Sequence, residues 1–129
     1  MPVVYLLRNE AGRTYVGSTV AGVAHRLRQH NGELVGGAAQ TARGRPWSVD
    51  CVVSGFRCRR EALQFEFAWR RAHRACRPRP PYTATGRRRA LAVLMARDRW
   101  SRNAPLACEV PLVVSDAEPR GPVGGSQTS

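Results

Sequence analysis

Two short runs of strand-forming residues near the N-terminus are separated by a single tight turn, and this arrangement constrains the fold more than any other stretch. The runs cover residues 3–8 and 13–17, with NEAG between them. Gly12 stands where a three-residue loop closed by a bulge needs a positive φ, which glycine adopts without strain. We therefore predict an antiparallel β-hairpin.

The register of this hairpin decides whether two tyrosines can act together. With a three-residue loop, Tyr5 and Tyr15 share one face as diagonal neighbours, roughly 7–8 Å apart. A loop one residue longer would put them on opposite faces, because side chains alternate along a strand. Taken alone, each tyrosine favours a structural role, since aromatic residues favour strands. A joint chemical role therefore requires the shared face.

The next segments alternate between helix and strand signals. Ser18 or Thr19 is predicted to cap a helix over residues 20–30, which the sequence HNG ends. The glycine-rich stretch 32–46 is predicted to be a long loop, and residues 47–56 a central, mostly apolar strand. This order of elements indicates one small α/β domain.

The strongest helical pattern covers residues 59–74, with a stripe of alanine and aromatic residues that should be buried. The stripe comprises Ala62, Phe65, Trp69 and Ala72. Glu66 lies beside the stripe, where a carboxylate is costly unless it pairs with a cation or binds a metal ion. A further helix is predicted over 86–97, and the composition of 115–129 predicts a disordered tail.

The charge of the chain indicates its partner. All 21 basic residues are arginine, against nine acidic residues, and the net charge is +12. A coding bias toward arginine explains the lack of lysine but not the positive excess. An excess of this size favours a polyanionic partner, of which nucleic acid is the most common.

The cysteines and the apolar pattern exclude other classes of protein. Cys51, Cys58, Cys76 and Cys108 form no C-x-x-C pair and no four-ligand zinc pattern. The N-terminal run has no secretory signal pattern, so we expect reduced thiols in an intracellular protein, with Cys51 in the core. No stretch approaches the roughly 20 apolar residues of a membrane-spanning helix, and no membrane partner is expected.

Five side chains have the chemistry that phosphodiester hydrolysis requires: a base, positive charge for the phosphate, a metal ligand and a route for protons. They are Tyr5, Tyr15, Arg26, His30 and Glu66. Arg26 and His30 share a helix face, arginine suits phosphate by its bidentate geometry, and one glutamate with waters suits Mg²⁺. Each residue also has a structural reading, such as an ion pair between Glu66 and an arginine. Spacing alone predicts only a basic α/β domain that binds nucleic acid.

A series of short motifs resembles the GIY-YIG nuclease superfamily. The residues Val4-Tyr5-Leu6 and Tyr15-Val16-Gly17 match its paired signature. The motifs RLRQHNGE, GGAAQT, GRPW, VVSGF and EALQFEFAW then follow in order. This order resembles the Slx-type structure-specific endonucleases, whose catalytic subunit acts on branched DNA. The resemblance extends over residues 2–110.

The resemblance implies a small α/β (α+β) fold with a three-stranded, largely antiparallel sheet flanked by helices. It implies that Tyr5 and Tyr15 line the active site, with Tyr15 the one expected to activate water. It also implies that Arg26 clamps the phosphate and that His30 assists proton transfer. Glu66 would hold one Mg²⁺ or Mn²⁺.

The resemblance also indicates DNA contacts beyond the catalytic residues. Thr41 matches a loop near the DNA, and Arg28, Arg43 and Arg45 are further candidates for contacts with the DNA backbone. Gly17, the signature glycine, is expected to allow tight packing at the end of its strand.

For the domain organisation we expect a nuclease core over 1–82, a helical extension packed on it over 83–114, and the tail 115–129. Similar proteins carry a C-terminal zinc-binding RING-like domain that docks to a scaffold subunit. This sequence lacks the cysteines for it, so a stand-alone core is expected and scaffold binding stays open. The implied substrate is branched or flapped DNA, in the nucleus or at a site of viral DNA replication.

Two other functions fit the same residues. One is a non-catalytic DNA-binding module that retains the fold. The other is a site-specific nuclease of the homing or restriction kind, which would usually need an added specificity domain. Cleavage of branched DNA would exclude the non-catalytic module. Cuts at defined sequences in linear duplex would support the site-specific nuclease.

Overall fold

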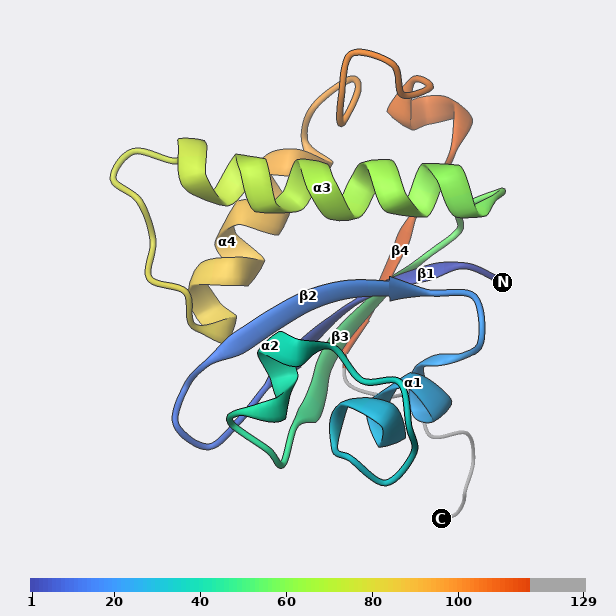
Figure 1. Ribbon diagram of the computed structural model, residues 1–129. Helices are drawn as coiled ribbons and strands as arrows, with labels where there is room; N and C mark the ends of the chain where they lie inside the picture. Colours follow the sequence, from blue (N-terminus) through green and yellow to red (C-terminus); the bar gives the residue numbers. More distant parts are fainter. Residues whose placement is uncertain (117–129) are drawn as a thin grey trace, which may run out of the picture.

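A four-stranded antiparallel sheet with helices on both faces forms the centre of the protein, as seen in a computed structural model that describes residues 1–116 (Figure 1). The strand order is β2-β1-β3-β4. The strands are β1 (Val3–Arg8), β2 (Thr14–Thr19), β3 (Ser48–Ser54) and β4 (Val113–Asp116). The α/β class and the antiparallel pairing are confirmed. The predicted count of three strands is wrong, because β4 adds an edge strand beside β3.

The N-terminal hairpin has the predicted turn and register. Gly12 adopts a φ of 86°, and its N–H donates to the Asn9 carbonyl at 3.1 Å. Asn9 also accepts from the Arg13 N–H through its side-chain oxygen at 2.9 Å, which stabilises the turn. Tyr5 pairs with Gly17, and Leu7 pairs with Tyr15. The two tyrosines are therefore diagonal neighbours on one face, as predicted.

Strand β4 includes Ser115 and Asp116, the first two residues of the predicted tail 115–129. Ser115 pairs with Val52, and Asp116 pairs with Cys51. Asp116 also forms an ion pair with Arg88 at 2.9 Å. A run of four residues carries too little alternation to predict a strand, and it becomes one because β3 offers a free edge. Residues 117–129 of the predicted tail lie outside the described residues.

The helices cover the two faces of the sheet separately. Helices α3 (Arg59–Ala75) and α4 (Ala84–Met95) lie on one face, whereas α1 (Val23–His30) and the short α2 (Ala39–Ala42) lie on the other (Figure 1). Helix α4 packs against α3 and contributes to the same core. Along residues 1–116, no helix combines the length and the apolar character that crossing a membrane requires.

The start of α1 and the loop after it differ from the predictions. The N-cap of α1 is Gly22, at a φ of 98°, rather than Ser18 or Thr19. The Thr19 hydroxyl instead accepts from the N–H of Ala21 at 3.0 Å, which forms a turn before the helix begins. The predicted loop 32–46 contains helix α2, which folds back over the end of α1.

Two hydrophobic clusters lie on opposite faces of the sheet. The larger one joins the sheet to α3 and α4, and all four residues of the predicted stripe are buried in it, as is Cys51. The smaller one comprises Tyr5, Leu7, Trp47, Val49 and Val52, with Val23 and Leu27 of α1 packed against it. The signature tyrosines therefore belong to the smaller cluster, under α1.

Two phenylalanines of α3 test this assignment of faces. Phe65 is fully buried against Phe56 and Trp100, whereas Phe67 is 60% exposed. Phe65→Ala should therefore lower the free energy of unfolding by about 3–5 kcal/mol, because it leaves a cavity. Phe67→Ala should change it by less than about 1 kcal/mol. Urea unfolding of both variants provides the measurement, and equal losses would contradict the observed orientation of α3.

Candidate active site

A chain of buried hydrogen bonds starts at the first signature tyrosine. The Tyr5 hydroxyl lies 2.7 Å from His30 Nε2, and His30 Nδ1 lies 2.7 Å from the Thr41 hydroxyl. Thr41 has one hydroxyl hydrogen, which it donates to the Ala38 carbonyl at 2.9 Å. Thr41 must therefore accept from His30 Nδ1–H, which leaves Nε2 as the acceptor of the Tyr5 proton.

Burial keeps both members of the Tyr5–His30 pair neutral. Burial raises the pKa of Tyr5 to about 12, and the guanidinium of Arg26 opposes this rise. Burial also lowers the pKa of His30 to about 4, to which the positive charges of Arg26 and Arg45 contribute. At neutral pH, Tyr5 therefore keeps its proton and His30 keeps a free lone pair that can accept it.

The segment after α1 holds this chain in place. Helix α2 brings Thr41 over His30, and the Trp47 indole N–H donates to the Thr41 carbonyl at 2.9 Å. The Asn31 side chain accepts from the Trp47 backbone N–H at 2.6 Å and donates to the Trp47 carbonyl at 3.1 Å. Thr41 is fully buried, which corrects the prediction that it contacts DNA. Its hydroxyl orients the imidazole of His30 instead.

Arg26 is positioned from α1 beside Tyr5. Its guanidinium is part-buried and donates to the Gln29 side chain and to the Gly36 carbonyl, both at 2.7 Å. Both bonds are made by Nη1, and they connect the helix to the loop 32–38. The Arg26 guanidinium opposes the rise in the pKa of Tyr5, and His30 forms a hydrogen bond with the Tyr5 hydroxyl. Both residues therefore face Tyr5, as expected from their predicted common face of the helix.

Glu66 approaches the same strand pair from α3. Its side chain is 17% exposed and forms an ion pair with Arg70 at 3.0 Å. Arg70 also donates to the Val16 carbonyl of β2, and its guanidinium lies 5.7 Å from the centre of the Tyr15 ring. Arg70 was missing from our sequence prediction. Its position four residues after Glu66 was the available signal.

Gly17 leaves the space that the two tyrosines occupy. A Cβ at this position would lie 2.6 Å from the Tyr5 hydroxyl oxygen and 2.9 Å from Tyr15. The expected tight packing at Gly17 is therefore confirmed. The rings of both tyrosines contact His30, with ring centres 5.7 Å away for Tyr5 and 5.0 Å for Tyr15.

The candidate site residues lie on β1, β2, α1 and α3, and a comparison with known protein families covers all four elements. The family model described as the GIY-YIG catalytic domain matches residues 1–79, more than half of the chain. This protein belongs to the GIY-YIG family. The five predicted catalytic residues all lie within the matched part of this GIY-YIG domain.

Several similar proteins are named structure-specific endonuclease subunit SLX1. One from Mycosarcoma maydis is 51% identical over 71 residues, which cover 54% of this chain and 11% of that protein. One from Schizosaccharomyces pombe is 51% identical over 69 residues, covering 50% and 25% respectively. One from Schizosaccharomyces japonicus is 43% identical over 111 residues, covering 76% and 40%. The matched segments thus span well under half the length of these relatives.

The three arginines predicted to contact DNA have different surroundings in this GIY-YIG protein. Arg28 is exposed and pairs with Glu33 at 3.2 Å. Arg45 donates to the His30 carbonyl at 2.7 Å, so it also fixes the end of α1. Arg43 is exposed and lines a groove beside β2. Their contact with DNA stays a prediction.

The carboxylate of Glu66 is the candidate metal ligand in the GIY-YIG site. Among residues 1–116, no cluster of three or more histidine, cysteine, aspartate or glutamate side chains could enclose a metal ion. Mg²⁺ does not need such a cluster, because it retains waters and commonly binds one or two carboxylates together with substrate phosphates. Glu66, whose side chain is partly exposed, fits that requirement.

The buried imidazole predicts a pH dependence of stability. Between about pH 6.5, the ordinary pKa of histidine, and the pKa of His30 near 4, the unfolded chain binds a proton that the folded protein excludes. The free energy of unfolding should therefore fall on acidification, by up to about 1.4 kcal/mol per pH unit from this group. His73, whose pKa burial also lowers, acts in the same direction.

Urea unfolding between about pH 7 and about pH 4.5 measures this dependence. His30→Gln should reduce the slope, and the part contributed by His73 should remain. An unchanged slope in His30→Gln would contradict the low pKa of His30.

The contact at Gly17 predicts the effect of a single methyl group. Gly17→Ala should lower the free energy of unfolding by about 1–3 kcal/mol, because the methyl group overlaps the Tyr5 hydroxyl. The displaced phenol should also expose His30, whose pKa, followed by NMR, should rise toward its ordinary value. Ser18→Ala, on the next residue of β2, serves as the control. A Gly17→Ala protein with an unshifted His30 titration would exclude this role of Gly17.

Proposed function

We propose that this protein is a divalent-metal-dependent endonuclease that hydrolyses phosphodiester bonds in branched DNA such as flaps, forks and junctions. The observation that carries the proposal is the buried Tyr5–His30–Thr41 chain, in which the Arg26 guanidinium lowers the pKa of Tyr5 and the Glu66 carboxylate raises it. The names of the similar proteins support a structure-specific endonuclease. The net charge of +12 suits a nucleic-acid substrate.

Tyr5 is the proposed base for the attacking water. Its hydroxyl accepts a proton from the water while its own proton passes to His30 Nε2, so no free phenolate has to form despite a pKa of about 12. Thr41 keeps His30 in the required tautomer. The sequence resemblance favoured Tyr15 for this step, but Tyr5 is the tyrosine bonded to His30. We assign Tyr15 to shaping the site, where its ring lies between His30 and Arg70.

Arg26 is the proposed clamp for the reacting phosphate. Its bonds to Gln29 and Gly36 fix the guanidinium before substrate arrives, so little ordering is needed during the reaction. A fixed guanidinium can hold two phosphate oxygens and stabilise the negative charge that develops on them.

Glu66 is the proposed ligand of one Mg²⁺ or Mn²⁺. When bound, such an ion polarises the phosphate and stabilises the leaving oxygen. Arg70 orients the carboxylate through the 3.0 Å ion pair and anchors it to β2 through the Val16 carbonyl. We further propose that the protein acts with a partner subunit, because the similar proteins are named subunits.

Alanine variants separate catalysis from binding. Arg26→Ala and Glu66→Ala should reduce cleavage of labelled flap DNA by about 100-fold or more, because each removes transition-state stabilisation. Both variants should still bind the same DNA. Arg89→Ala and Glu10→Ala are the matched controls, since these exposed residues lie outside the proposed catalytic residues, and they should cleave saturating DNA at the wild-type rate.

A substrate panel decides between the candidate functions. The purified protein is tested with Mg²⁺ or Mn²⁺ on duplex, flap, fork and four-way DNA. Binding without any cleavage would indicate a DNA-binding module instead of a nuclease. Cuts at defined sequences in linear duplex would indicate a site-specific nuclease. Full activity of Glu66→Ala would exclude Glu66 as the metal ligand.

A further inference from the structure

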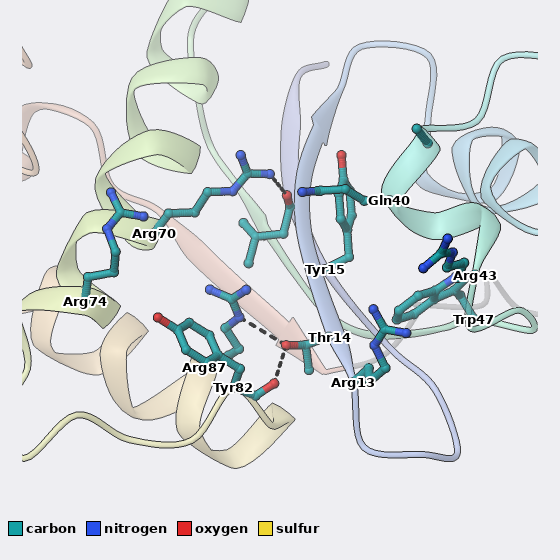
Figure 2. A pocket seen from close by; sticks show the side chains of 12 residues that line it. Arg13, Thr14, Tyr15, Gln40, Arg43, Trp47, Arg70, Arg74, Tyr82 and Arg87 are labelled. Atoms are coloured by element: carbon teal, nitrogen blue, oxygen red, sulfur yellow. Dashed lines mark hydrogen bonds between the residues drawn. The ribbon is translucent and has the colours of Figure 1, made fainter.

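A groove rich in arginine lies beside the start of β2 (Figure 2). It adjoins the proposed catalytic cluster, which comprises Tyr5, Tyr15, Arg26, His30 and Glu66, because Tyr15 also lines the groove. One wall comes from α3 and α4, and the opposite wall from the segment around α2. The arginines that line it are Arg13, Arg43, Arg70, Arg74 and Arg87. The described residues of the lining include no carboxylate. Only Arg70 of these five is needed to hold the proposed metal ligand.

Arg87 shows that the positive charge of the groove is concentrated and fixed. Its guanidinium donates to the Thr14 hydroxyl at 3.1 Å, and that hydroxyl donates to the Tyr82 carbonyl at 2.6 Å. Burial lowers the pKa of Arg87, and the charges of Arg70 and Arg74 lower it further. Cations held this close repel one another, and an anion between them would relieve the repulsion.

The groove is suited to the backbone of a nucleic acid rather than to its bases. The Tyr82 ring stacks on His73 with ring centres 4.2 Å apart, and the Arg87 guanidinium lies 5.0 Å from its centre. His73 therefore covers one face of this ring, and the Arg87 guanidinium lies over the ring as well, although Tyr82 is 44% exposed. Trp47 is buried, and Tyr15 belongs to the catalytic cluster. What the groove offers to a ligand is mainly guanidinium N–H donors, which match phosphate oxygens.

The position of the groove relates it to the substrate. It contacts Thr14, Tyr15 and Val16 of β2, whereas a second pocket contacts Ser18 and Thr19 at the other end of the strand. That second pocket includes Arg26 and Arg59. A DNA strand that follows the edge of β2 would place its reacting phosphate at Arg26 and further phosphates in the groove.

We propose that the arginine groove binds backbone phosphates of the substrate strand on one side of the cleaved bond, and that Arg74 and Arg87 are its main contacts. The choice of DNA as ligand rests on the proposed function. The groove itself supplies affinity and does not touch the reacting atoms. Its contribution should be independent of base sequence and should weaken with salt, because phosphate contacts release counterions.

Binding of labelled flap DNA in the presence of EDTA tests the groove without cleavage. Arg74→Gln and Arg87→Gln should each weaken binding about tenfold, as expected for a lost charge-assisted hydrogen bond. Each should also reduce the slope of log affinity against log salt by about 0.9 for every phosphate contact removed. The matched controls are Arg71→Gln on α3 and Arg89→Gln on α4, exposed arginines outside the groove that should bind like wild type.

Replacing single phosphates of the DNA by uncharged analogues shows which phosphates contact the arginine groove. Methylphosphonates are placed one at a time on either side of the cleavage position. Wild-type protein should lose affinity at positions on one side, and Arg74→Gln should be insensitive at those same positions. Cleavage at subsaturating DNA should fall in Arg74→Gln in proportion to the lost affinity, whereas the control Arg71→Gln should cleave like wild type.

The outcomes separate this proposal from the endonuclease proposal. Wild-type affinity in both groove variants, or equal losses in the variants and the controls, would overturn the groove as a binding site. Lost binding in the variants of a protein that never cuts DNA would support the groove and refute the nuclease. Because Arg74 is exposed, Arg74→Gln remains informative if Arg87→Gln lowers the melting temperature.

Discussion

The hydrogen bond between Tyr5 and His30 is the constraint on which the rest of the site depends. It joins β1 to the end of α1 inside the smaller hydrophobic cluster, where an unpaired hydroxyl or imidazole would be costly. The turn at Gly12 sets the register that points Tyr5 toward α1, and Gly17 leaves room for its ring. Helix α2 then completes the chain with Thr41. The register of the hairpin, the end of α1 and the fold of the loop that contains α2 thus all contribute to one buried interaction.

Arg70 connects several groups beside the strand pair β1 and β2. Arg70 contacts the Glu66 carboxylate, the β2 backbone and the Tyr15 ring, and it also lines the groove. The catalytic cluster and the groove therefore share a wall. For the proposed DNA substrate, this arrangement places the charge proposed for affinity next to the charge proposed for chemistry.

Patterns within a few residues predicted most of the fold. The hairpin followed from Gly12, and the buried face of α3 followed from helical spacing. Three features were missed: strand β4, helix α2 and the true start of α1. Each is short, and each is stabilised by partners distant in the sequence, such as β3 for β4 and His30 for α2. Local propensity cannot indicate such contacts.

The sequence by itself determined the candidate site residues, because the motifs select Tyr5, Tyr15, Arg26, His30 and Glu66 and the hairpin register places the two tyrosines on one face. The tertiary structure decided the surroundings of each one. Burial made the tyrosine and the histidine a neutral pair, and it turned Thr41 from an expected DNA contact into a support for His30. It also gathered arginines from β2, α3 and α4 into one groove. Burial and the proximity of like charges depend on the packing of distant segments, and no local pattern encodes them.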